Sequence, residues 1–142
     1  MSIITKMTAP ASAPPRRRLP RDAPKVLCVD DEPNVLEGLR DNLSRSFDVR
    51  VAESGAEGLA LLQQDPDGYA VVISDMRMPV MSGAAFLNQA RRISPDAVRV
   101  LLTERARYGL FPAQGNVLPT GPNFVTARDA GKAIELSKRS IR

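Results

Sequence analysis

Four polar residues could do chemistry together if the fold brought them to one place, and they are Asp30, Asp31, Asp75 and Thr103. Each follows a run of apolar residues of strand length. Carboxylates that lie close together repel one another unless a hard cation such as Mg²⁺ binds between them, through their oxygens and water. A Zn²⁺ site is implausible because the chain has no His and one Cys. The acidic residues therefore predict a magnesium site.

Asp75 could also act as a nucleophile, since a carboxylate can attack phosphorus and form an aspartyl phosphate. A bound Mg²⁺ would neutralise the charge that builds on the transferred oxygens, and Thr103 could donate its hydroxyl to them. A single Asp after a strand is more often a turn former or a helix cap. Three Asp residues on neighbouring strand ends, with a matching Thr, favour a phosphoryl-transfer site over that simpler role.

The elements that must position these residues alternate along the chain. Short apolar runs at 26–29, 69–73 and 98–102 predict strands, and Val49 and Val51 indicate a shorter one. The stretches between them have helical spacing, so the sequence predicts an α/β fold with a doubly wound parallel sheet covered on both faces. Parallel strands share one carboxyl edge, so residues that follow three of them would meet there.

Three helices are expected between these strands. The first begins near Pro33, because proline suits the first helical turn, and its apolar residues recur at spacings of three and four as far as Phe47. The second opens at Ser54, with Glu57 three residues later as in a capping box. The third begins near Ser82. Each helix would pack one apolar stripe on the sheet.

The two ends of the chain lack this regularity. Residues 1–24 are rich in Pro, Ala and Arg and cannot bury enough apolar surface to offset the entropy of ordering, so we expect a disordered leader. Residues 104–126 contain three Pro and three Gly, which fit neither a helix nor a long strand. A helical pattern returns from Ala127 to Ile141. We expect one domain over 25–142 with an irregular or incomplete fifth strand and last helices.

Composition excludes several classes of protein. Cys28 lies within an apolar run and has no partner for a disulfide, so we expect a buried core residue in a reducing cytosol. No run approaches the roughly 20 apolar residues of a membrane span, and the N-terminus lacks the apolar core of a secretory signal. These features predict a cytoplasmic protein.

The net charge of +4 is unevenly distributed. Residues 1–24, 25–103 and 104–142 carry +4, −4 and +4. The acidic central region repels nucleic acid, and basic tails are usually solvated. No nucleic-acid partner is therefore predicted.

Three motifs resemble the receiver domain of bacterial two-component response regulators, which has a flavodoxin-like fold. The motifs are Val29-Asp30-Asp31-Glu32-Pro33, then Ile73-Ser74-Asp75-Met76-Arg77-Met78-Pro79 with Ser82-Gly83, and finally Val100-Leu101-Leu102-Thr103. Their order and spacing are specific, and the resemblance spans about residues 25–103.

The resemblance implies a role for each site residue. Asp75 would be the phosphoacceptor, Asp30 and Asp31 the carboxylates that hold Mg²⁺, and the backbone carbonyl of Arg77 a further metal ligand. Thr103 would be the hydroxyl that contacts the phosphoryl group. The implied partner is a sensor histidine kinase or a phosphotransfer protein, and the domain would not be an enzyme, apart from slow autodephosphorylation.

The family also places a Lys at the end of strand five, where its ammonium pairs with the acceptor carboxylate. Counting onward from Thr103 leads to Val125, and the nearest Lys is Lys132 in the last predicted helix, so no residue can be assigned this role. Glu104 replaces a small residue and would bring a negative charge near the incoming phosphoryl group. Residues 104–142 therefore depart from the family pattern.

Two explanations of this departure are open. The chain is a divergent receiver that rebuilt this part of the fold, or a reading-frame shift near residue 104 replaced the native ending, which the abrupt loss of periodicity favours. Three functions are also open. They are a phosphoaccepting receiver, a pseudo-receiver that binds a partner without switching, and a metal-dependent phosphohydrolase, ranked last because Arg77 stands where a second acid/base carboxylate would be needed.

Overall fold

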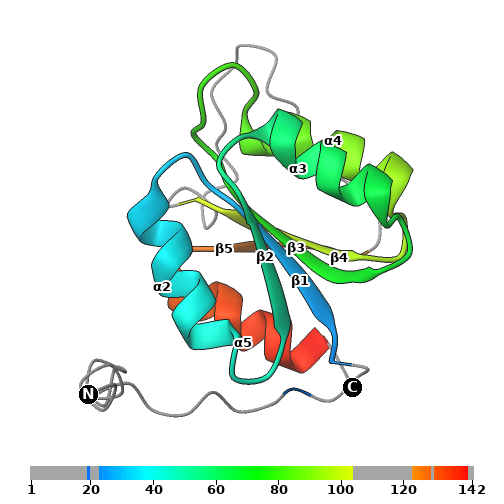
Figure 1. Ribbon diagram of the computed structural model, residues 1–142. Coiled ribbons are helices and arrows are strands. Elements are labelled where there is room, and N and C mark those ends of the chain that lie inside the picture. The colour runs from blue at the N-terminus through cyan, green and yellow to red at the C-terminus, as the bar shows by residue number, and fades with distance from the viewer. Residues whose placement is uncertain (1–18, 20–22, 104–122, 129, 141–142) are drawn as a thin grey trace, which may run out of the picture.

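A five-stranded parallel sheet forms the centre of the molecule (Figure 1). The computed structural model describes Leu19 and residues 23–103, 123–128 and 130–140. The strand order is β2-β1-β3-β4-β5, the flavodoxin-like order of a doubly wound sheet, so the predicted fold class is confirmed. The elements are β1 (Lys25–Val29), α2 (Pro33–Leu43), β2 (Asp48–Ala52), α3 (Gly55–Gln64), β3 (Tyr69–Asp75), α4 (Gly83–Ile93), β4 (Val98–Leu102), β5 (Phe124–Ala127) and α5 (Ala130–Ser140).

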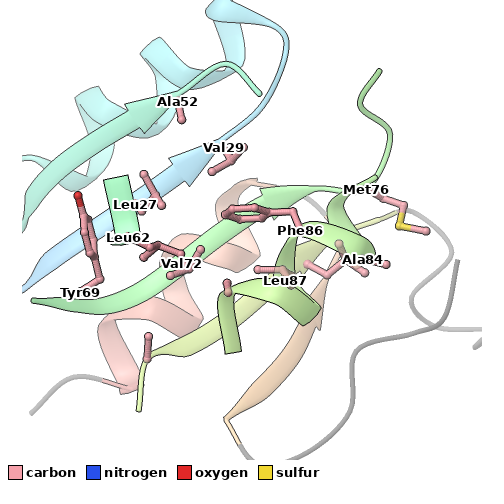
Figure 2. Close-up of a cluster of buried hydrophobic side chains, with 13 residues drawn as sticks. Leu27, Val29, Ala52, Leu62, Tyr69, Val72, Met76, Ala84, Phe86 and Leu87 are labelled. Atoms are coloured by element: carbon pink, nitrogen blue, oxygen red, sulfur yellow. The ribbon is translucent and has the colours of Figure 1, made fainter. Parts of the chain in front are cut away.

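Helices α3 and α4 cover one face of the sheet, where the larger core cluster lies (Figures 1 and 2). The ring of Phe86 projects from α4 against the sheet and is fully buried. A methyl group on Gly58 of α3 would meet this ring and the side chain of Val29. Small residues on α3 therefore allow the two helices to pack closely over β1 and β3.

Helices α2 and α5 cover the other face (Figure 1). The apolar stripe predicted for the first helix is confirmed, since Leu36, Leu39 and Leu43 are all buried. They pack with Cys28, which is buried and free, as expected. Burial raises the pKa of the Cys28 thiol to about 12.

Helices α2, α3 and α4 begin at the residues that the sequence predicted as helix starts. Pro33 stands in the first turn of α2. The hydroxyl of Ser54 accepts a hydrogen bond from the backbone N–H of Glu57 (3.1 Å), and the Glu57 carboxylate accepts one from the backbone N–H of Glu53 (3.2 Å). The glutamate thus reaches the residue before the cap rather than the cap itself. The hydroxyl of Ser82 caps α4 in the same way.

The C-terminal part of the fold corrects one expectation. Residues 124–126, expected to be irregular, form most of β5, which pairs in parallel with β4 from Arg99↔Phe124 to Leu102↔Ala127. The reason is local: Phe, Val and Thr favour strands, and a strand at the edge of a sheet can be short. The expected leader (apart from Leu19, Ala23 and Pro24) and the expected irregular segment 104–122 lie outside the described residues.

The last helix also differs from its prediction. It begins at Ala130 rather than Ala127, because Ala127 completes β5 and Arg128 forms a bend. Its buried face contains Ala133 and Ser137, whose hydroxyl donates to the Ala133 carbonyl (2.8 Å). Ile134 is only partly buried, and Ile141 lies outside the described residues. None of the described helices combines the length and apolar character that a membrane crossing requires.

Gly83 allows α4 to begin directly against the end of β3. Its N–H donates to the carbonyl of Met76 (2.9 Å), and a methyl group at this position would clash with the backbone carbonyl of Asp75. Any larger residue must therefore push α4 away from the strand that presents Asp75.

We predict that Gly83→Ala lowers the free energy of unfolding by about 1–3 kcal/mol, the usual cost of overpacking. Gly38→Ala is the matched control, because Gly38 also lies in a helix but a methyl group there meets no atom within 4 Å. It should raise stability by about 0.5–1 kcal/mol, since alanine favours the helix. Urea denaturation followed by circular dichroism measures both, and equal effects of the two variants would contradict the packing described here.

Candidate metal centre

Three carboxylates converge at the C-terminal edge of the sheet. Asp30 and Asp31 follow β1, Asp75 ends β3, and the two strands are paired so that Val29 lies opposite Ser74. One oxygen atom from each of the three carboxylates lies within 4.8 Å of the others. The convergence predicted from the strand ends is thus what the structure has.

Asp30 is the most enclosed member of this cluster, with 3% of its surface exposed. Its Oδ1 accepts a hydrogen bond from the N–H of Glu32 (2.9 Å), and its own N–H donates to the carbonyl of Ala52 (3.1 Å). Burial raises the pKa of Asp30 to about 6; the Glu32 N–H opposes this shift, and the neighbouring charges of Asp75 and Asp31 add to it.

Asp75 is half-buried and is held from the loop that follows it. The backbone N–H of Arg77 donates to Asp75 Oδ2 (3.1 Å). Burial raises the pKa of Asp75, the Arg77 N–H partly offsets this, and the negative charges of Asp31 and Glu32 raise it further. The loop thus holds Oδ2 of the carboxylate in place.

The donor set fits a hard divalent cation. Within the described part of the chain, no Lys or Arg forms an ion pair with any of the three carboxylates. Ligands on opposite sides of Mg²⁺ lie about 4 Å apart, so the spacing of these oxygens suits one ion with water in its remaining positions. Asp30, Asp31 and Asp75 are therefore residues that could hold Mg²⁺.

Two further predicted site residues lie beside the cluster. Arg77 is exposed, and its backbone is tied to Asp75 through the N–H described above. Thr103 follows Leu102, the residue of β4 that pairs with Asp75, and its N–H donates to the carbonyl of Ala127 (2.8 Å). Both therefore belong to the loops at this edge, Arg77 after β3 and Thr103 after β4.

No described Lys stands at the end of β5. The strand ends at Ala127, which is 2% exposed, whereas Val125 lies within it, opposite Val100. Lys132 lies in α5, where its ammonium pairs with the exposed carboxylate of Glu135 (2.9 Å). Glu104 lies outside the described residues. The position that the family resemblance reserves for a Lys is thus taken by Ala127.

Two residues that stand in the motifs named above support the acceptor through contacts that the sequence analysis did not predict. Ser74 is fully buried, and its hydroxyl donates to the backbone carbonyl of Asp75 (2.9 Å). Gly83 lies against the same carbonyl. The supporting role of Ser74 could have been suspected because it is a polar residue at the end of the most apolar strand. That of Gly83 could have been suspected because a glycine at the first position of a helix often allows a close approach of backbone.

Comparisons with known proteins point to one family. The family model described as "Response regulator receiver domain" matches residues 26–111. The chain is 40% identical over 138 residues to the sensor histidine kinase TmoS of Ectopseudomonas mendocina, a match that covers 84% of this chain and 14% of that protein. The chain spans 14–33% of the length of the first curated relatives that it matches.

Solved structures share the fold. A response regulator receiver domain from Clostridium thermocellum superposes with a TM-score of 0.64, at 24% identity, over 83% of this chain and 94% of that one. A structure of the histidine kinase ThkA in complex with the response regulator TrrA contains a chain that superposes with a TM-score of 0.63, at 27% identity, over 84% and 99% of the two chains.

The raised pKa of Asp30 predicts how stability changes with pH when no divalent cation is present. Below about pH 4 the Asp30 carboxyl is mostly protonated in both the folded and the unfolded protein, so its burial costs little. Above about pH 6 it is ionised in both, and the folded protein bears the full free-energy cost of the buried charge. Stability should therefore fall as the pH rises through this window. In EDTA at pH 7.5, Asp30→Asn should be more stable than wild type by about 3 kcal/mol, and near pH 4 most of the difference should be lost.

Urea denaturation at the two pH values tests this prediction. Asp96→Asn is the matched control, because Asp96 is exposed and lies outside the cluster. Added Mg²⁺ should stabilise wild type at pH 7.5 more than it stabilises Asp30→Asn. An Asp30→Asn variant that is less stable than wild type in EDTA at pH 7.5 would show that the buried, ionised carboxylate of Asp30 does not destabilise the folded state.

Proposed function

The chain belongs to the response regulator receiver domain family, and on this basis we propose that Asp75 accepts a phosphoryl group beside a Mg²⁺ held by Asp30 and Asp31. The single observation that carries the proposal is the convergence of these three carboxylates, with oxygens within 4.8 Å, at the edge of the sheet. Receiver domains are in general signalling modules rather than enzymes, and the proposed role is that of a phosphoacceptor in a two-component phosphorelay.

Each neighbouring residue has a role in this proposal. The oxygen of Asp75 that is not bonded to Arg77 N–H attacks phosphorus, the bond from phosphorus to the donor imidazole nitrogen breaks, and that nitrogen keeps the electron pair. Bound Mg²⁺ would neutralise charge on the transferred oxygens. The backbone carbonyl of Arg77 would complete the protein ligands of the ion, and the hydroxyl of Thr103 would donate to the phosphoryl group once it is in place.

We propose a sensor histidine kinase, or a phosphotransfer protein, as the donor. The similarity to a segment of the sensor histidine kinase TmoS supports this class of partner, as does the likeness to a chain in the ThkA–TrrA complex.

We also propose a cytoplasmic location. The free, buried Cys28 suits a reducing compartment, which supports this location. The division into a leader (1–24) and a receiver (25–142) belongs to the same proposal.

A second candidate is a pseudo-receiver that binds a partner without being switched by phosphorylation. Ala127 favours this candidate, because the end of β5 carries no ammonium that could pair with the acceptor or with an attached phosphoryl group. The two candidates differ in whether Asp75 can be phosphorylated at all, so one experiment separates them.

We predict that acetyl phosphate labels the wild-type protein in the presence of Mg²⁺, that EDTA abolishes the labelling, and that Asp75→Asn abolishes it as well. Asp96→Asn removes the same charge from an exposed position and should be labelled like wild type. Phosphate-affinity electrophoresis and intact mass spectrometry measure the product. A folded wild-type protein that stays unlabelled would instead support the pseudo-receiver.

A further inference from the structure

All three methionines of the described part of the chain lie in the loop between β3 and α4, at Met76, Met78 and Met81. Met76 is 8% exposed and lies at the end of β3, at the margin of the core cluster in Figure 2. Met78 and Met81 pack against the same cluster but are only partly buried. Methionine sulfur is a common target of oxidants. The loop therefore carries oxidisable groups close to Asp75.

The sulfur of Met81 lies between α3 and α4. A methyl group on Gly55, the first residue of α3, would meet the Met81 Sδ at 2.6 Å and its Cγ at 3.2 Å. From α4, the side-chain Nε2 of Gln89 donates to Met81 Sδ (3.8 Å). Met81 is partly exposed and Gln89 is exposed, so this contact is open to solvent. Met81 thus combines a sulfur that a small oxidant can approach with an amide donor already directed at it.

Oxidation of this sulfur by a hydroperoxide is a balanced transfer of one oxygen atom. A sulfur lone pair attacks the terminal peroxide oxygen, the S–O bond forms, and the O–O bond breaks. The sulfur is oxidised to a sulfoxide, while the peroxide is reduced and its remaining oxygen takes up the proton and leaves as water or an alcohol. A thioether is a weak acceptor, whereas a sulfoxide oxygen is a strong one. The amide of Gln89 is therefore placed to stabilise the product.

The packing of Met81 connects this sulfur to the acceptor. A sulfoxide makes the apolar side chain polar, which weakens its packing against Gly55 and the core cluster. The same loop holds Oδ2 of Asp75 through the N–H of Arg77 (3.1 Å). It is also fixed at its far end, where the N–H of Gly83 donates to the carbonyl of Met76 (2.9 Å). Loss of the Met81 contact would therefore change how the loop positions the Asp75 carboxylate.

We propose that Met81 is a site of reversible oxidation by hydroperoxides, and that its sulfoxide releases the loop between β3 and α4 from α3 and slows phosphorylation of Asp75. The first half of this inference concerns the sulfur alone. The second half rests on the proposed function, because it concerns the acceptance of a phosphoryl group by Asp75. Methionine sulfoxide reductases restore the thioether, so the effect is reversible.

The oxidation site is tested by treating the folded protein with increasing concentrations of hydrogen peroxide and locating the added oxygen by peptide mass spectrometry. Met81 should be oxidised at lower peroxide concentrations than Met76, which is 8% exposed. In protein unfolded by urea the two residues should react alike, because burial no longer distinguishes them. Oxidation of Met81 should also lower the urea concentration at the midpoint of unfolding. Equal reactivity of Met81 and Met76 in the folded protein would overturn the site.

The effect on phosphorylation is tested by the rate of labelling with acetyl phosphate and Mg²⁺, before and after peroxide treatment and removal of the peroxide. In wild type the rate should fall roughly tenfold or more, the scale of a small misplacement of a reacting group, and methionine sulfoxide reductase should restore it. Met81→Leu keeps the apolar volume but has no sulfur, so treatment should leave its rate unchanged. Met78→Leu is the matched control, because it makes the same change at a partly buried methionine of the same loop, and treatment should slow it as it slows wild type.

The outcomes separate this inference from the function on which it rests. If untreated wild type is labelled but oxidation of Met81 leaves the rate unchanged, or if Met81→Leu loses as much of its rate as wild type, the effect on phosphorylation is overturned and the phosphoacceptor stands. If folded, untreated wild type is not labelled, the phosphoacceptor fails and the effect on phosphorylation fails with it. The order in which Met81 and Met76 react then still decides the oxidation site. A rate that falls in wild type and Met78→Leu, but not in Met81→Leu, supports the whole inference.

Discussion

The cost of burying carboxylates and holding three of them together is the constraint on which the functional site depends. The parallel register of β1 and β3 places Asp30, Asp31 and Asp75 together, and burial removes the water that would otherwise screen them. The pKa of both Asp30 and Asp75 is raised as a result. The fold thus bears a local cost that a divalent cation would remove, which is how a stable scaffold can be made to depend on an ion.

Much of this could be predicted from the sequence because the signals are local. Short apolar runs specify parallel strands, and parallel strands leave their following residues on one edge, so Asp30 and Asp75 could be brought together without knowledge of the fold. The capping residues Ser54 and Ser82 set the starts of two helices in the same way. Tertiary support of the acceptor was harder to predict. Gly83 matters because of a carbonyl eight residues earlier, and spacing alone does not reveal such a close approach.

The end of the chain could not be predicted for a different reason. Four residues make β5, and such a short edge strand has no periodicity to detect. Its partner, β4, supplies the information: Arg99 donates its backbone N–H to Asn123 (2.7 Å), and its guanidinium lies over the ring of Phe124. The match to TmoS covers 84% of the chain and so cannot be confined to residues 1–103. Together with β5 and α5, it favours a divergent receiver over a shifted reading frame.

Ala127 has a consequence for how a phosphoryl group could be read out. An ammonium at the end of β5 would tie that strand directly to Asp75, whereas the small apolar side chain of Ala127 cannot, and Ala127 meets this edge through its backbone, whose carbonyl accepts the N–H of Thr103. An effect of phosphorylation on β5 would then pass through backbone contacts such as that of Thr103 rather than through a charged side chain of β5. The loop after β3, by contrast, is bonded to Asp75 itself through Arg77 and packs on α3 and α4. The face made by α3, α4 and that loop is therefore connected to Asp75 by more direct contacts than the face made by β5 and α5.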